Sequence, residues 1–262
     1  MESLPDRPAV VLAAIPARYG ATRFPGKPLA EILGRPMIAW VVEAARAAGR
    51  VDDVAVVTDD ESVARAARNA GARAVVSLRS AASGSDRIAH LLAADPIAGR
   101  ATIVVNVQGD EPLIEPGAID AAVDALAADS AADIVTLVRT LRGGEDANDP
   151  NLVKAVVGHT GRALYFSRAP IPSGGAGRIH VGLYAYRRAA FDRFVTAPPT
   201  ALEETERLEQ LRALELGLVI RCVAFDSHSI AVDVPADIAR VEAALQRPAP
   251  GRAGGSGSDQ SG

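Results

Sequence analysis

A short loop near the start of the chain concentrates positive charge between prolines. Within ten residues it contains three cations and two glycines: Arg18, Gly20, Arg23, Gly26 and Lys27. Glycine can adopt positive φ and turn backbone N–H groups toward an anion, and the cations add charge attraction. The loop therefore predicts a polyphosphate site rather than a merely solvated basic loop.

Two common phosphate-binding motifs do not match this loop. A Walker A motif has four residues between its glycines and a Ser or Thr after its lysine. Here five residues separate Gly20 from Gly26, and Lys27 is followed by Pro28. No G-x-G-x-x-G opens a helix after the first predicted strand, as dinucleotide binding would require. The sequence thus disfavours both a P-loop ATPase and an NAD-binding protein.

Two carboxylates are expected at the same edge of the fold as the basic loop. Asp110 follows a predicted strand at residues 102–107, and Asp233 lies at the end of a predicted strand at residues 230–234. Magnesium prefers oxygen ligands, usually one or two carboxylates together with substrate phosphates. Asp110 and Asp233 are therefore predicted magnesium ligands, although each also fits a turn or helix N-cap residue.

The elements that must position these residues alternate between strand and helix in the first half of the chain. The apolar run at residues 9–15 predicts a buried strand of a parallel sheet, covered on both faces. A helix is predicted to start at Pro36 and to stop before Gly49. Further predicted strands cover residues 54–58, 72–77, 102–107 and 133–139, and further helices cover 62–69, 85–93 and 116–127. This alternation indicates βαβ units.

The second half of the chain has a different pattern. Predicted strands at 153–158, 163–167 and 181–187 have little helix between them; a helix at 201–216, a strand at 219–225 and a closing helix at 235–246 follow. We therefore expect an α/β fold with three layers and a mostly parallel twisted sheet carrying a smaller mixed or antiparallel extension. It should form a single domain at 1–247, followed by a disordered Gly/Ser-rich tail at 248–262.

Composition limits the function classes further. Hydrophobic residues make up 48% of the 262 residues, but no stretch of about 18 apolar residues occurs to cross a membrane. The net charge of −4 gives no reason to expect nucleic acid as a partner. The single cysteine, Cys222, cannot form an internal disulfide and is expected to pack in a strand. Residues 1–8 lack a signal-peptide pattern, so a cytoplasmic location is expected.

Seven segments resemble, in order, motifs of the cytidylyltransferases that activate 3-deoxy-sugar acids, most closely the 3-deoxy-D-manno-octulosonate (KDO) cytidylyltransferase family. They are IPARYGATRFPGKPL at 15–29, SGSDR at 83–87, VNVQGDEP at 105–112, ALYFSRA at 163–169, HVGLY at 180–184, LEQLR at 208–212 and VDVP at 232–235. The resemblance implies the fold of the nucleotide-diphospho-sugar transferases. It also implies a homodimer.

The resemblance assigns one group of residues to CTP. The phosphates would be bound by Arg18, Arg23 and Lys27, and the cytidine would lie beside Arg87 and Gln108. The catalytic residues implied are Arg18, Lys27 and Asp110. Asp110 and Asp233 would bind Mg²⁺, in agreement with the carboxylate chemistry above.

A second group would bind the sugar acid, namely Arg168, His180, Tyr184, Glu209 and Gln210. Arginine can hold a carboxylate through two parallel hydrogen bonds, and Glu and Gln side chains can bind hydroxyl groups. Without the resemblance, His180 equally fits a neutral histidine in a strand and Tyr184 an aromatic residue of the core. Glu209 and Gln210 equally fit a solvated helix face. No role is assigned to His90, His159 and His228, and Lys154 remains open.

The implied reaction joins CTP and KDO to give CMP-KDO and pyrophosphate, for lipopolysaccharide-type glycan synthesis. One departure from the family pattern affects the sugar and the dimer: residues 173–179 form a short Gly-rich link where the family carries a longer insertion. A related acid therefore stays open as substrate, either an amino-substituted octulosonate (8-amino-KDO) or a sialic-type acid. A non-catalytic nucleotide-binding homologue is the alternative outside enzymes.

Overall fold

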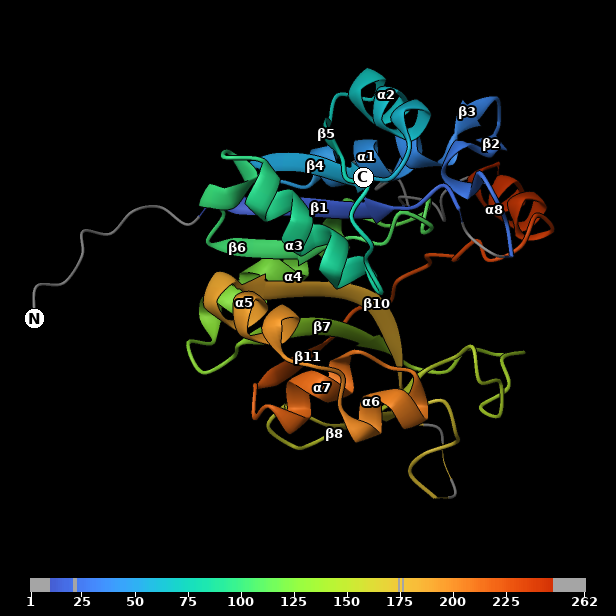
Figure 1. Ribbon diagram of the computed structural model, residues 1–262. Helices are drawn as coiled ribbons and strands as arrows, with labels where there is room; N and C mark the ends of the chain where they lie inside the picture. The colour runs from blue at the N-terminus through green and yellow to red at the C-terminus, as the bar shows by residue number, and fades with distance from the viewer. Residues whose placement is uncertain (1–9, 21–22, 174, 176, 247–262) are drawn as a thin grey trace, which may run out of the picture.

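A computed structural model describes residues 10–20, 23–173, 175 and 177–246; the predicted tail at 248–262 lies outside them. Nine of the described strands form one sheet, whose main path has the order β11-β7-β10-β6-β1-β4-β5 (Figure 1). Its first half is parallel and is built from β1 (Val11–Ala17), β4 (Asp53–Thr58), β5 (Arg73–Val76) and β6 (Ile103–Asn106). This half confirms the predicted βαβ pattern.

The second half of the sheet is mixed, as expected. The long strand β10 (Arg178–Arg187) runs antiparallel between β6 and β7 (Ile134–Arg139), while β11 (Ile220–Ala224) is parallel to β7. The antiparallel extension consists of β8 (Lys154–Val157), which pairs with β10, and β9 (Ala163–Ser167), which pairs with β8. One long strand thereby joins the main sheet to its extension.

Helices cover both faces of the sheet and give three layers (Figure 1). One face packs on α1 (Met37–Ala47), α2 (Glu61–Asn69) and α4 (Pro116–Ala128). The other packs on α3 (Gly84–Ala94), α5 (Arg188–Thr196) and α7 (Gln210–Glu215). Ile15 packs on the first face and Leu12 on the second, so β1 needs apolar residues at successive positions. This explains the continuous apolar run.

The prediction of a strand at 230–234 is wrong. These residues have no regular secondary structure and precede α8 (Asp237–Leu245). Their backbone groups bind elsewhere: Val232 N donates to Asp110 O at 2.9 Å, and Val232 O accepts from Lys27 Nζ at 2.9 Å. The apolar pattern is real, since Val232 is fully buried, but the segment packs against the basic loop.

The prediction of one helix at 201–216 is also wrong. The structure has α6 (Ala201–Glu206) and α7, separated at Arg207, whose backbone is left-handed with φ 55°. The helix α5 and a short hairpin of β2 (Glu31–Ile32) and β3 (Arg35–Pro36) were not predicted.

A buried ion pair explains the break between α6 and α7. Arg212 Nε and Nη2 each donate to Glu203 at 2.8 Å, and both residues are at most 9% exposed. In one continuous helix, the side chains of Glu203 and Arg212 would be nine positions apart. They would then lie on opposite faces, about 13 Å apart along the axis. The turn at Arg207 brings them together.

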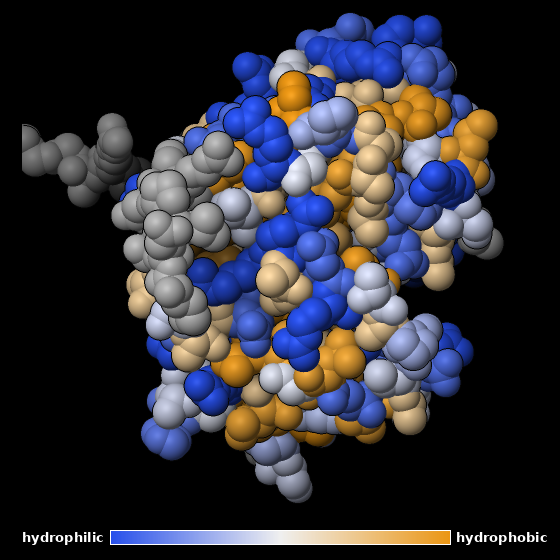
Figure 2. Space-filling view, turned by 60° about the vertical axis from the view of Figure 1, so that its left-hand side comes forward, coloured by the Kyte–Doolittle hydropathy of each residue, from blue (hydrophilic) through white to orange (hydrophobic). Residues whose placement is uncertain are grey.

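On the face shown in Figure 2, hydrophilic residues are interspersed with apolar ones, which are most frequent in the lower part of the view. Large apolar residues with high exposure, such as Leu78 at 84% and Leu164 at 62%, lie far apart in the sequence. None of the described helices is long and apolar enough to span a membrane.

Removing the buried cation should destabilise the fold strongly. We expect Arg212→Ala to lower the free energy of unfolding by about 3 to 5 kcal/mol, because it leaves the Glu203 carboxylate buried without its partner. The control is Arg68→Ala, which removes an exposed pair with Glu61 and should cost about 1 kcal/mol or less. Urea unfolding followed by circular dichroism measures both. Equal losses in the two variants would contradict this role for the pair.

Candidate active site

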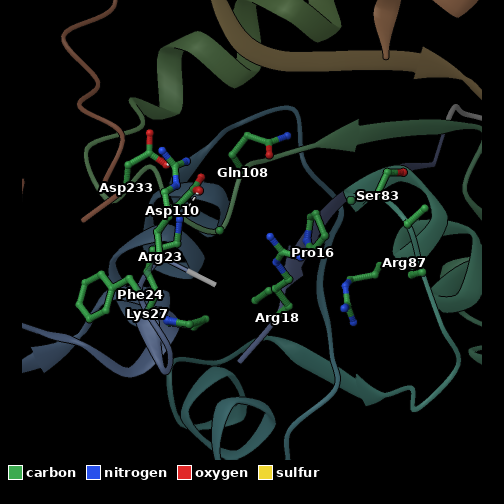
Figure 3. A pocket seen from close by; sticks show the side chains of 16 residues that line it. Pro16, Arg18, Arg23, Phe24, Lys27, Ser83, Arg87, Gln108, Asp110 and Asp233 are labelled. Atoms are coloured by element: carbon green, nitrogen blue, oxygen red, sulfur yellow. Dashed lines mark hydrogen bonds and ion pairs between the residues drawn. The ribbon is translucent and has the colours of Figure 1, made fainter. Parts of the chain in front are cut away.

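A cavity of about 420 Å³ lies at the carboxyl ends of β1 and β6, where parallel strands meet at one sheet edge. All seven residues predicted to bind CTP or magnesium line it: Arg18, Arg23, Lys27, Arg87, Gln108, Asp110 and Asp233. In Figure 3, Arg23, Lys27, Asp110 and Asp233 gather on one side, with Arg87 and Ser83 on the other and Arg18 between them. The sequence-predicted nucleotide residues are therefore brought together.

Lys27 is the most connected cation of the cavity. Its Nζ lies 2.6 Å from Asp110 Oδ2 and donates to Val232 O at 2.9 Å, and its side chain is only 15% exposed. The residue begins a short 3₁₀ helix, η1 (Lys27–Leu29), after Gly26, whose φ of 73° favours glycine. Gly20, in contrast, does not have the positive φ that the sequence suggested.

The two predicted metal ligands lie on the same side of the cavity, each beside a cation. Asp233 Oδ1 accepts from Arg23 Nη2 at 2.7 Å, just as Asp110 pairs with Lys27. Among the described residues, no group of three or more His, Cys, Asp or Glu side chains could hold a metal by itself. Two carboxylates fit an ion whose remaining ligands come from phosphates and water, which is how magnesium usually binds.

Arg87 is held in place by a residue that sequence reasoning missed. Its Nη2 lies 3.2 Å from Asp59 Oδ2, and Asp59 Oδ1 accepts from the backbone N of Tyr19 at 2.8 Å. Asp59 therefore ties the basic loop to α3. The signal that could have found it is its position directly after strand β4, at the same sheet edge as Asp110.

Gly109 allows the loops after β1 and β6 to approach closely. A Cβ at this position would lie 2.8 Å from Pro16 O, which no side chain can tolerate. Beside it, Gln108 Nε2 donates to Asn106 Oδ1 at 3.1 Å. The glycine thus sets the distance between the basic loop and the acidic run.

A second cavity of about 310 Å³ adjoins the first. Gly84 and Gln108 line both cavities, so the two lie side by side there. The second cavity is also lined by all five residues predicted to bind the sugar acid: Arg168, His180, Tyr184, Glu209 and Gln210. The structure therefore places the two predicted half-sites next to each other.

Arg168 is anchored by backbone carbonyls at the rim of the second cavity. Its guanidinium donates to Pro150 O at 2.9 Å, to Glu206 O at 3.1 Å and to Arg207 O at 3.4 Å. A guanidinium has five N–H groups, so two remain for a carboxylate. Lys154, which the sequence left open, is fully buried and donates to Arg168 O, so it supports this segment.

Burial disfavours the charged forms of three polar groups in the second cavity. It lowers the pKa of His180 to about 3, so the imidazole is uncharged at neutral pH. It also raises the pKa of Tyr184 and of Glu209, while Ser85 Oγ donates to Glu209 Oε2 at 2.8 Å and favours the carboxylate. Such a lining suits hydroxyl groups, with the cation Arg168 reserved for an anion.

Two further residues were missed by sequence reasoning. Ser85 links α3 to Glu209, and Glu111 holds Ser229 Oγ at 2.9 Å on the segment that carries Asp233. Burial, reinforced by the neighbouring Asp110 charge, raises the pKa of Glu111 to about 7. Neither residue could be assigned from the sequence, because both act through partners more than 100 residues away.

The remaining histidines lie outside both cavities, in agreement with the absence of any assigned role. His90 Nδ1 is 3.4 Å from Ser77 Oγ, and His228 is largely exposed beside Glu115. Cys222 lies in β11 and is buried, as the sequence predicted.

Comparisons with known proteins identify the family of the chain. A cytidylyltransferase family model matches residues 12–220. The 3-deoxy-manno-octulosonate cytidylyltransferases of Anaeromyxobacter dehalogenans strain 2CP-1 and Geobacter sulfurreducens are 50% and 46% identical; the matches cover 90% and 88% of this chain and 97% of each relative.

Solved structures give the same result. CMP:2-keto-3-deoxy-manno-octonic acid synthetase, solved in complex with CTP, has a TM-score of 0.83 and 37% identity over 90% of this chain and 98% of its own. The fold is therefore that of this synthetase. Taken with the sequence relatives, this shows that the chain belongs to the cytidylyltransferases and, among them, to the 3-deoxy-manno-octulosonate cytidylyltransferase family.

Proposed function

We propose that this enzyme transfers CMP from CTP to the anomeric C2 hydroxyl of KDO, giving CMP-KDO and pyrophosphate for lipopolysaccharide-type glycan synthesis. The observation that carries the proposal is the adjacency of two cavities with different chemistry, which share Gly84 and Gln108 in their linings. One is lined by cations that suit a triphosphate, the other by Arg168 and hydroxyl-binding groups. The names of the relatives point to the same two substrates.

The reaction needs positioning and charge neutralisation more than covalent catalysis. The C2 oxygen attacks the α-phosphorus in line and forms the new P–O bond, while the bond to the bridging oxygen of pyrophosphate breaks. The hydroxyl proton is released to water, and pyrophosphate leaves with the electron pair. Lys27, Arg18 and Arg23 offset the charge that develops on the leaving group.

We propose Mg²⁺ as the cofactor, held by Asp110 and Asp233. When bound, it would neutralise phosphate charge and act as a Lewis acid on the triphosphate. In the described structure these carboxylates pair with Lys27 and Arg23. Nucleotide binding would free them, because the two cations would then pair with phosphates. The homodimer and the cytoplasmic location remain predictions.

The first test concerns the substrates. Pyrophosphate release should require CTP, KDO and Mg²⁺ together, because the C2 hydroxyl is the nucleophile. A coupled pyrophosphate assay measures this, with 8-amino-KDO and a sialic acid as parallel substrates. KDO should give the highest rate. Pyrophosphate release from CTP without any sugar, or CTP binding with no product after long incubation, would contradict the proposed reaction. A faster rate with another acid would change the assignment of the sugar substrate.

The second test concerns the metal ligands. We expect Asp110→Asn to lower kcat by at least about a hundredfold, because it weakens a ligand of the ion that neutralises the phosphates. The amide can still accept from Lys27, so the fold should be kept. Asp233→Asn should act in the same direction. The control is Asp124→Asn on α4, which removes the ion pair of Asp124 with Arg50. A wild-type rate for Asp110→Asn at saturating magnesium would refute the assignment.

The third test separates the two half-sites. Lys27→Ala should lower kcat, because it removes a charge that stabilises the leaving pyrophosphate. Arg168→Lys keeps the charge but loses the planar fork, so the KM for KDO should rise about tenfold to a hundredfold while CTP binding stays the same. The control is Arg65→Lys, an exposed arginine on α2 that lines neither cavity. If Arg168→Lys raises the KM for CTP instead, the half-sites are assigned the wrong way round.

A further inference from the structure

An irregularity in β10 carries the two aromatic residues of the second cavity. The pairing with β7 shifts between Val181 and Tyr184, so Gly182 and Leu183 have no opposite residue. A Cβ on Gly182 would lie 3.1 Å from Glu111 Oε1, so a larger residue here would require the Glu111 carboxylate to shift. His180 and Tyr184 stand on either side of this bulge, and both line the cavity.

Thr136 lies opposite the bulge on β7 and contacts it with its hydroxyl group. The residue is fully buried. Its Oγ1 lies 2.8 Å from Leu183 O, 3.3 Å from Val181 O and 2.9 Å from His180 Nε2. Carbonyl oxygens only accept, so the single hydroxyl proton must point at the bulge carbonyls, chiefly at Leu183 O. A contact of 2.8 Å between two oxygens without a proton between them would be repulsive.

The position of that proton determines the tautomer of His180. Since the Thr136 hydroxyl donates to a carbonyl, its oxygen must accept from His180, and the ring proton is therefore on Nε2. The ring is neutral, because its pKa is about 3, and so it has no second proton for Nδ1. Nδ1 has no hydrogen-bond partner among the described residues, and it is not one of their buried unpaired atoms. It is therefore accessible in the cavity.

We propose that Thr136 is a positioning residue for the sugar acid: it fixes His180 as the Nε2–H tautomer, so that the Nδ1 lone pair accepts a hydrogen bond from a sugar hydroxyl. Edge contacts with Phe166 and a tilted contact with Tyr184 keep the ring in this orientation. The substrate part of the proposal rests on the proposed function. The tautomer itself does not, because it follows from contacts within the protein.

The arrangement makes His180 selective for a donor. A buried acceptor that meets an acceptor or an apolar group loses its hydrogen bond, whereas a hydroxyl satisfies it. His180 thereby complements Arg168, which provides only donors. The sugar acid would donate a hydrogen bond from a hydroxyl group to His180 and would accept hydrogen bonds from Arg168 with its carboxylate.

The tautomer is measured directly on the free enzyme by nitrogen-15 NMR of the histidine rings, whose shifts and couplings distinguish Nε2–H from Nδ1–H. The signal of His180 is assigned by its loss in His180→Gln, with the other histidines as internal references. We expect Nε2–H. A proton on Nδ1 would overturn the proposal, whatever the substrate of the enzyme is.

Substitution at Thr136 tests the link to the sugar. Thr136→Val keeps the shape but removes the acceptor, so the Nδ1–H form should gain population and the KM for KDO should rise about tenfold to a hundredfold. The KM for CTP should change less than about twofold. Thr136→Ser keeps the hydroxyl group and should restore both the tautomer and the KM.

The outcomes separate the two proposals. A raised KM for KDO with an unchanged tautomer in Thr136→Val would show that Thr136 acts only through packing of the bulge, and would overturn the inference. A wild-type enzyme with Nε2–H that does not turn over KDO would instead refute the proposed function, while the role of Thr136 in the tautomer would stand.

Discussion

The ammonium group of Lys27 is the point on which the site depends. It contacts Asp110 Oδ2 at 2.6 Å and Val232 O at 2.9 Å, so one nitrogen joins the loop after β1, the loop after β6 and the segment before α8. These segments come together only because β1 and β6 are parallel neighbours whose carboxyl ends meet at one edge. The same lysine that would neutralise a phosphate thus also holds Asp110 and the segment that carries Asp233.

The two cavities divide the chemistry between charge and hydrogen bonding. The first pairs two of its cations, Arg23 and Lys27, with the carboxylates of Asp233 and Asp110. In the second, burial keeps His180 neutral and Ser85 holds Glu209, so its groups discriminate by donor and acceptor pattern. Gly84 and Gln108 line both cavities, and the proposed reaction would take place where they meet.

Sequence patterns predicted the parts that depend on local order. The apolar run of β1 and the loop with Lys27 identified the sheet and its functional edge, because burial on two faces and clustered cations leave clear signals. The segment at 230–234 and the break at Arg207 were missed, since both are decided by distant partners: Lys27 and Asp110 for the first, and the pair of Glu203 and Arg212 for the second. Thr136 was missed for the same reason, whereas Asp59 could have been found from its position directly after β4.

A crystal structure with CTP, Mg²⁺ and an unreactive analogue of KDO tests most directly whether the two cavities form one active site. The triphosphate should lie among Arg18, Arg23 and Lys27, with the analogue carboxylate on Arg168 and the α-phosphorus facing its C2 position across Gly84 and Gln108. A nucleotide whose α-phosphorus points away from the second cavity, or an analogue bound outside it, would contradict the account.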